Sequence, residues 1–147
     1  MAAEKTFDVA TLGNYTKDTI VTAAGTQHAD GGGVTYSAHA ARTLGRKVAA
    51  ITRLAEEDFR VVRSLEDFGI TVFATVTPSS TLMRLEYPTD NPDERILSVA
   101  DTAGSFTPDQ VRAVDAKAYI ISPSIRGEFP VETVRELRKK DAIISAD

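Results

Sequence analysis

Short apolar segments alternate with helical segments along the chain, and this order strongly limits the folds that it can adopt. The predicted strands of this kind are 7–12, 48–52, 70–76, 118–122 and 142–146. The predicted helices are 34–44, 56–68, one that starts at 107, and 130–140. Successive strands separated by helices need crossover connections, which place helices on both faces of a mainly parallel sheet. The sequence therefore predicts an α/β protein of three layers.

Two further pairs of segments have a more polar, alternating character. Residues 19–21 and 26–29 are predicted to form a short hairpin, and residues 81–87 and 95–99 form another around the turn-rich TDNPDE. Such half-polar strands do not suit a sheet that is buried on both faces. We therefore expect them to stand off the main sheet as a small appendage.

Size and composition exclude several classes of function. The 147 residues amount to about one domain, and the absence of cysteine excludes disulfides and thiolate metal sites. The 17 basic and 21 acidic side chains form no basic stripe, which disfavours nucleic-acid binding. No apolar run approaches the length of a membrane span, and the N-terminal MAAEKTFD lacks the apolar core of a signal peptide. A cytoplasmic protein without nucleic-acid or membrane partners is expected.

Three consecutive glycines, Gly31–Gly33, stand directly before a predicted helix. Neither the phosphate-binding pattern G-x-x-x-x-G-K-[ST] nor a G-x-G-x-x-G after the first strand is present. The glycine spacing therefore argues against another nucleotide-binding α/β class, such as a Rossmann-type oxidoreductase. Two interpretations remain open: a flexible turn that caps the helix, or bare backbone N–H groups that meet ligand oxygens at the helix N-terminus.

Asp18 lies just past the end of the first predicted strand. Its carboxylate could accept hydrogen bonds from two ligand hydroxyls. The other interpretation is a loop Asp that bonds its own backbone, which is the commoner case. His28 and His39 have no partner at ligand spacing, and the acidic turn at 90–94 lacks the EF-hand pattern, so no metal site is predicted.

Several segments together resemble the ribokinase-like (PfkB) carbohydrate kinases in order and spacing. They are VATLGNYTKDTIV, GGGVTYSAHAARTLG, VAAITRLAEEDF, FGITV and TLMRLEYPTDNPDERIL. The resemblance covers essentially all 147 residues, but only the N-terminal half of such an enzyme. Within the family, LGNYTKD, GGGV without a following Asn, ISPSIRGEFP and the final ISAD are most similar to the myo-inositol kinase-like branch.

The resemblance implies a three-layer αβα ribokinase-like fold with a small β-lid, truncated before the nucleotide-binding half. Residues 1–147 would be the N-terminal substrate-binding part, with lid segments at about 15–30 and 79–100. The C-terminal ATP-binding part, with its G-x-G-D signature, is absent. The chain stops at Asp147, at the carboxyl end of a predicted strand, where open α/β sheets bind ligands. We therefore expect it to be part of a longer protein.

The resemblance also implies roles for individual residues. Asp18 matches the acid that binds substrate hydroxyls, and Gly31 and Gly32 match the di-glycine that hinges the lid and presents backbone amides. Tyr36 stands where family members usually carry Asn, which favours a polyol other than the usual sugar. Arg126 lies in a segment near the active-site rim and is a candidate for contacting anionic or hydroxylated groups of the ligand.

The function implied is that of an ATP-dependent carbohydrate or cyclitol kinase, with this chain as the half that binds a sugar or polyol such as an inositol. The catalytic Asp of G-x-G-D lies beyond the chain end, so no catalytic residue or metal ligand is assigned here. ATP and Mg²⁺ are expected for the full-length enzyme only, and the chain alone is expected to be inactive. A homodimer through the lid strands is also implied. The alternative is a non-catalytic polyol-binding or dimerisation module derived from such a kinase.

Overall fold

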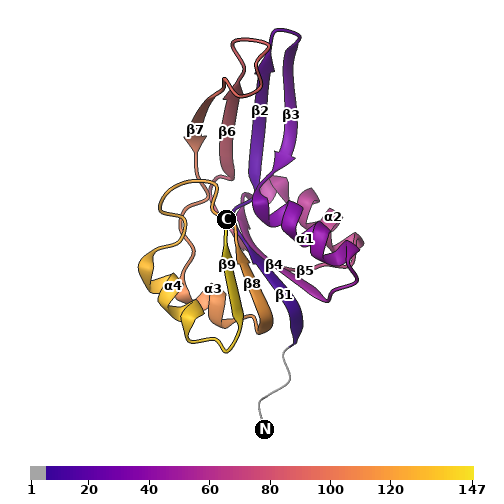
Figure 1. The fold of residues 1–147 in the computed structure, drawn as a ribbon, viewed down its shortest axis with the longest axis vertical. Coiled ribbons are helices and arrows are strands. Elements are labelled where there is room, and N and C mark those ends of the chain that lie inside the picture. The colour runs from indigo at the N-terminus through magenta and orange to yellow at the C-terminus, as the bar shows by residue number, and fades with distance from the viewer. Residues whose placement is uncertain (1–5) are drawn as a thin grey trace.

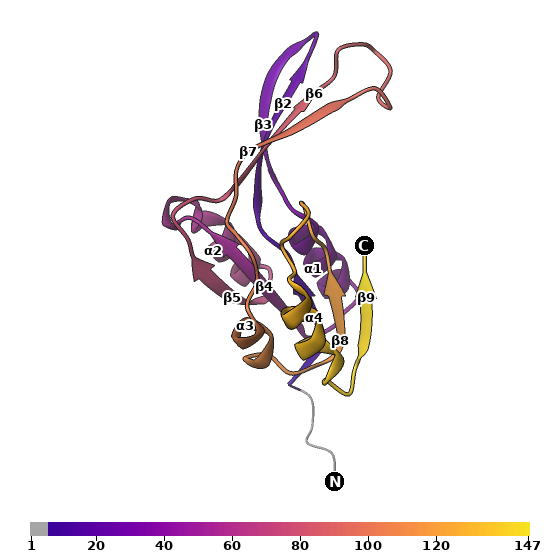
Figure 2. The same ribbon diagram turned by 90° about the vertical axis from the view of Figure 1, so that its left-hand side faces the viewer.

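The computed structural model describes residues 6–147, which form two separate sheets (Figures 1 and 2). Residues 1–5 lie outside the described residues. They are part of the N-terminal MAAEKTFD, which the sequence predicts is not a signal peptide. The large sheet contains β1 (Phe7–Leu12), β4 (Val48–Leu54), β5 (Thr71–Val76), β8 (Ala116–Ile121) and β9 (Ile143–Ala146). The small sheet contains β2 (Thr16–Thr22), β3 (Gly25–Gly31), β6 (Thr81–Glu86) and β7 (Ile96–Asp101). The helices are α1 (Gly33–Thr43), the 3₁₀ turn η1 (Glu56–Asp58), α2 (Arg60–Asp67), α3 (Pro108–Arg112) and α4 (Val131–Arg138).

The large sheet is parallel throughout, in the order β5-β4-β1-β8-β9. Helices α1 and α2 cover one face of this sheet, and α3 and α4 cover the other (Figure 1). The predicted α/β class with a mainly parallel sheet between two helix layers is therefore confirmed. Within residues 6–147 no helix is long and apolar enough to cross a membrane.

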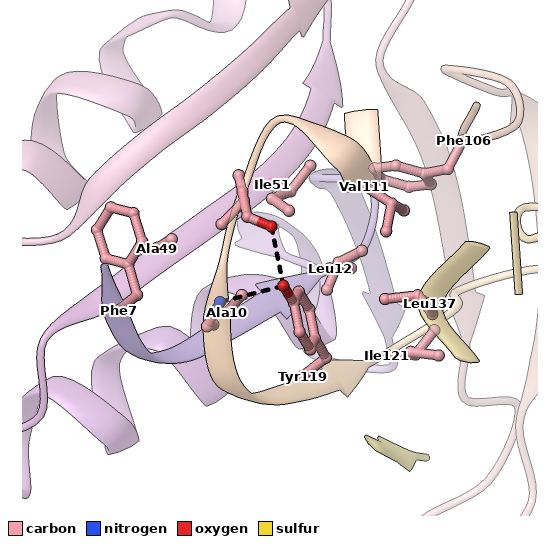
Figure 3. Close-up of a cluster of buried hydrophobic side chains, with 12 residues drawn as sticks. Phe7, Ala10, Leu12, Ala49, Ile51, Phe106, Val111, Tyr119, Ile121 and Leu137 are labelled. Atoms are coloured by element: carbon pink, nitrogen blue, oxygen red, sulfur yellow. Dashed lines mark hydrogen bonds between the residues drawn. The ribbon is translucent and has the colours of Figure 1, made fainter. Parts of the chain in front are cut away.

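Each face of the large sheet has its own buried cluster because neighbouring residues of a strand point to opposite faces. Leu12 of β1 packs with Phe106 and Leu137 on the side of α3 and α4 (Figure 3). Val9 packs instead against the cluster that contains residues of α1 and α2. Tyr119 is fully buried, and its hydroxyl is paired there. It donates a hydrogen bond to the Val114 carbonyl at 2.8 Å and accepts one from the Ala116 N–H at 3.1 Å.

Two details of the predicted helices are wrong. Phe68, expected on the buried face of a helix over 56–68, is 46% exposed, because that segment is η1 followed by a shorter α2 that ends at Asp67. Val131, expected to point inward, is 54% exposed at the first position of α4. Thr133 is buried there instead, because its hydroxyl donates to the Phe106 carbonyl at 2.7 Å.

The small sheet stands above the edge of the large sheet where the parallel strands end (Figures 1 and 2). Its order is β3-β2-β6-β7, with two antiparallel hairpins joined by the parallel pair β2 and β6. The chain enters this sheet directly after β1 and returns to α1, and later it enters from β5 and returns to α3. Four short connections thus meet at one edge of the large sheet.

Candidate functional site

The carboxyl end of β1, the start of α1 and the end of β8 approach one another closely. A Cβ atom on Gly13 would lie 2.5 Å from the Ser122 carbonyl oxygen, and one on Gly33 would lie 2.5 Å from the Ser122 Cβ. Both distances are shorter than any that a real side chain tolerates, so only glycine fits at these two positions.

Gly31 and Gly32 form a corner between β3 and α1, called here the glycine corner. A Cβ on Gly31 would collide with the Asp18 carboxylate and the Thr16 hydroxyl. Gly32 has a φ of 97°, and its Cβ would lie 2.6 Å from the Asn14 carbonyl oxygen. The corner is therefore packed tightly against the start of β2, and Gly32 is the N-cap residue of α1, as the capping interpretation expects.

Asp18 lies inside β2, not in a loop, in register with Ala29 of β3 and Met83 of β6. One carboxylate oxygen, Oδ2, faces Gly31. The other, Oδ1, is buried and accepts no hydrogen bond from the described residues. Buried acceptors are almost always paired, so an unpaired carboxylate oxygen beside a bare backbone marks a place where a donor group can bind.

The other two residues singled out from the sequence lie elsewhere around this edge. Tyr36 is in the first turn of α1, with 64% of its surface exposed. Arg126 is exposed in the loop that follows β8, where it lines a hollow of about 360 Å³ with Ile125 and Phe129. Within residues 6–147, no hydrogen bond or ion pair joins either side chain to Asp18. The structure thus brings Asp18, Gly31 and Gly32 together, and no bond among the described residues joins Tyr36 or Arg126 to Asp18.

A polar cluster that the sequence did not reveal holds the glycine corner against α2. The Tyr15 hydroxyl donates to Asp30 Oδ1 at 2.5 Å, and the two terminal nitrogens of the Arg60 guanidinium donate to the Asp30 carboxylate at 2.6 Å. The hydrogen bond from Arg60 holds the pKa of Asp30 below its ordinary value. Burial, and then the bond to Asp30, raise the pKa of Tyr15. Asp30 directly precedes Gly31, so this cluster fixes where the corner lies.

Lys17 makes a second attachment between the small sheet and the body of the protein. Its ammonium lies 3.0 Å from Asp58 Oδ1 and 3.2 Å from Glu57 Oε1 in η1. Asp58 is buried and also accepts a hydrogen bond from the Ser80 hydroxyl at 2.6 Å. The bond to Asp58 raises the pKa of Lys17.

Glu128 is a further residue that the sequence reasoning missed, since it treated the segment around it as an ordinary loop. The side chain is only 2% exposed, and its Oε2 accepts a hydrogen bond from the Ser124 N–H at 3.0 Å. Burial raises the pKa of Glu128. No sequence signal identifies it, because the neighbouring Arg126 and Gly127 are exposed and no periodic pattern runs through the loop.

Among residues 6–147, no group of three or more His, Asp or Glu side chains is placed to hold a metal ion. The acidic groups nearest the glycine corner are either paired with Lys17 and Arg60 or lie singly, as Asp18 does. No step that involves Mg²⁺ is therefore assigned to this chain.

Comparison with solved structures places the fold among sugar and inositol kinases. A pyrophosphate-dependent kinase in the ribokinase family, solved as a sulfate complex, superposes with a TM-score of 0.86 at 31% sequence identity, over 95% of this chain and 49% of that chain. Another structure, a pyrophosphate-dependent kinase in the ribokinase family complexed with a pyrophosphate analog and myo-inositol, gives 0.84 at 29% identity, over 95% of this chain and 48% of that one.

A more distant likeness supports the fold alone. Ribokinase from Thermotoga maritima gives a TM-score of 0.67 at 15% identity, over 96% of this chain and 52% of that chain. No protein-family model matches the sequence, and comparison with curated protein sequences gives no match either. The chain therefore has the ribokinase-like fold and is a structural relative of the ribokinase-family kinases, spanning about half of their length.

Proposed function

We propose that this chain supplies the acceptor-binding half of a carbohydrate or cyclitol kinase, which transfers a phosphoryl group to a hydroxyl of a sugar or polyol such as an inositol. The observation that carries the proposal is the position of Asp18, whose unpaired carboxylate oxygen lies beside the glycine corner. The similarity to a kinase solved with myo-inositol supports a polyol as the ligand.

In this proposal the residues of the chain bind and orient the acceptor. The Asp18 carboxylate accepts hydrogen bonds from two neighbouring hydroxyls, each contributing about 1.5–3 kcal/mol. Backbone N–H groups at the start of α1, next to Gly32, donate to ligand oxygens. The small sheet covers this edge, which keeps water from the hydroxyl that is to be phosphorylated. Holding that hydroxyl in line with the donor lowers the entropic part of the barrier.

The donor site and the catalytic Asp, which takes the proton from the attacked hydroxyl, belong in this proposal to a part of the enzyme that the chain does not contain. The resemblance in sequence implies ATP with Mg²⁺, whereas two of the similar solved structures are named as pyrophosphate-dependent kinases. Both donors are therefore needed in the assay. We place the enzyme in the cytoplasm.

Asp18→Asn tests the proposal, because it keeps the size of the side chain and removes its charge. Calorimetric titration with myo-inositol should show affinity lowered by about tenfold or more, as expected for one hydrogen bond to a charged group. In a full-length kinase, kcat/KM with ATP or pyrophosphate should fall by a similar factor. Asp90→Asn, at the exposed tip of the second hairpin, is the matched control and should change neither. A loss within about twofold for Asp18→Asn would contradict the role given to Asp18.

The alternative, a non-catalytic polyol-binding or dimerisation module, is favoured by one feature. Strand β7 is exposed along its whole length and carries the apolar side chains Ile96, Leu97 and Val99 at the edge of the small sheet. An edge strand of this kind can pair with a second copy of the chain. Sedimentation velocity would reveal such a dimer. Binding of myo-inositol without transfer from either donor would favour this alternative.

A further inference from the structure

Glu128 lies where three separate segments meet below the small sheet. The first is the loop after β8, residues 122–130, to which Glu128 and Arg126 belong. The second, residues 13–15, carries the chain from β1 into the small sheet. The third, residues 102–107, carries the chain out of that sheet toward α3. All three are irregular segments, so hydrogen bonds between them set their relative positions.

Glu128 and its neighbours connect these segments by a short series of bonds. The Glu128 carboxylate accepts from the Ser124 N–H and also faces Asn14, whose amide Nδ2 donates to the Gly104 carbonyl at 2.9 Å. The backbone carbonyl of Glu128 accepts from the Phe106 N–H at 2.8 Å. Beside it, the Ser105 hydroxyl donates to the Gly127 carbonyl at 2.8 Å.

A buried acid at this place is a poor way to gain stability. Glu128 is 2% exposed, its Oε1 accepts no hydrogen bond, and no Lys or Arg of the described residues forms an ion pair with it. The amide oxygen of Asn14 is likewise buried and unpaired. An apolar side chain of similar size would avoid this desolvation cost. The carboxyl group is better explained by what it positions.

We propose that Glu128 is a positioning residue of the acceptor site: its buried carboxyl holds the loop that carries Arg126 in register with the segments through which the chain enters and leaves the small sheet. Asn14 is four residues before Asp18 and its carbonyl borders Gly32, so a shift of this segment moves both. The effect on ligand binding rests on the proposed function, whereas the connection between the three segments does not.

Two variants of Glu128 separate positioning from space filling. Glu128→Gln keeps the size and one oxygen that accepts from Ser124, whereas Glu128→Met keeps a similar volume and removes every acceptor. Amide hydrogen exchange, followed by NMR on the chain without ligand, should be about tenfold faster at Ser124, Asn14 and Phe106 in Glu128→Met, as the loss of a buried hydrogen bond predicts. Glu128→Gln should restore rates close to those of the wild type. Glu132→Gln, exposed on α4, is the control and should leave these rates unchanged.

Equal exchange rates in Glu128→Met and Glu128→Gln would overturn the proposal, because the side chain would then only fill space. If Glu128→Met does not fold, Ser105→Ala replaces it, since it removes a neighbouring bond at an exposed residue. Exchange at Phe106 and Ser124 should then rise by about threefold, and unchanged rates would overturn the proposed connection.

Titration with myo-inositol adds the functional readout. Affinity should fall about tenfold in Glu128→Met and recover in Glu128→Gln. A wild-type chain that does not bind myo-inositol would argue against the proposed function, and the exchange rates would still decide the role of Glu128. If the wild type binds and Glu128→Met binds equally well, the positioning role is wrong.

Discussion

The two sheets of this protein differ in how their residues are buried. In β4 of the large sheet every residue except Arg53 is buried, and β1 carries the fully buried Ala10 and Leu12. In β7 of the small sheet all residues are exposed. The central strands of the large sheet therefore stabilise the fold by burying apolar surface on both faces, whereas its edge strand β9 is exposed along its whole length. The small sheet gains little in this way, and it carries the unpaired carboxylate of Asp18.

The small sheet is instead attached at its base by polar contacts. Residues Lys17 and Asp30 are paired across β2 and β3, and each forms an ion pair with the body of the protein, Lys17 with Asp58 and Asp30 with Arg60. Asp18, the next residue of β2, points to the opposite face of the same sheet because strand side chains alternate. One face of the hairpin thus anchors it while the other presents Asp18. The residues that anchor the hairpin and the residue proposed to contact the ligand therefore lie on different faces of the small sheet.

The largest expected effect comes from a matched pair of truncations in the two sheets. Leu12→Ala, at a residue with 0% exposure, should lower the free energy of unfolding by about 2–5 kcal/mol, because it leaves a cavity in the core. Leu97→Ala in β7, where the side chain is 44% exposed, should lower it by less than about 0.5 kcal/mol. Urea unfolding followed by circular dichroism measures both. Similar losses in the two variants would show that the small sheet contributes to the core after all.

Much of the large sheet could be predicted from the sequence because its signals are local. Apolar runs separated by amphipathic helices predict crossover connections, and all five strands of the large sheet were located to within a few residues. The errors at Phe68 and Val131 arise at helix ends, where a single hydrogen bond, such as that from Thr133, decides which residue turns inward. Periodicity does not contain that information.

The site was less accessible to sequence reasoning because its parts are far apart in the chain. Asp18 and the glycines were found through a motif and a resemblance, and the structure places them in contact. Arg60 is thirty residues from Asp30, and Glu128 more than a hundred from Asn14, so no spacing rule connects them. Whether Tyr36 and Arg126 contact a ligand stays a prediction, since both are exposed without a partner at the site.

An intermediate effect is expected at the glycine corner, where the two sheets meet. Gly32→Ala should lower the free energy of unfolding by about 1–3 kcal/mol, because a φ of 97° with a ψ of 127° is a conformation that residues other than glycine rarely adopt. The new Cβ would also lie 2.6 Å from the Asn14 carbonyl oxygen, which adds to the loss. Gly45→Ala is the comparison, because Gly45 also has a positive φ, of 75°, but a Cβ there would meet no atom within 4 Å. Thermal unfolding compares them. Equal losses would mean that the corner can open without cost, against the close packing described here.

The smallest expected effect concerns the ion pair that anchors the hairpin. Asp30 has its pKa lowered by the hydrogen bond from Arg60, so folding favours its charged form. The stabilisation is therefore fully present when the pH is above 3.8, the ordinary pKa of an Asp carboxyl. It is lost as the pH falls through the lowered pKa of Asp30 in the folded protein. Because Arg60 is 61% exposed, Arg60→Gln should lower the free energy of unfolding at pH 7 by only about 0–1 kcal/mol.

Urea unfolding of the wild type and Arg60→Gln across the acid range tests this linkage. The difference between them should be constant above pH 3.8 and shrink toward zero below it. Arg84→Gln is the control, because the pair of Arg84 and Glu86 has similar exposure but lies within β6 and joins no other element. A larger amide-exchange effect at Gly31 from Arg60→Gln than from Arg84→Gln would show that the anchoring face of the hairpin controls the corner. Equal effects of the two variants would mean that the ion pair of Arg60 and Asp30 does not control the glycine corner. The hydrogen bond from Tyr15 would then be the remaining side-chain contact of Asp30 that could hold the corner in place.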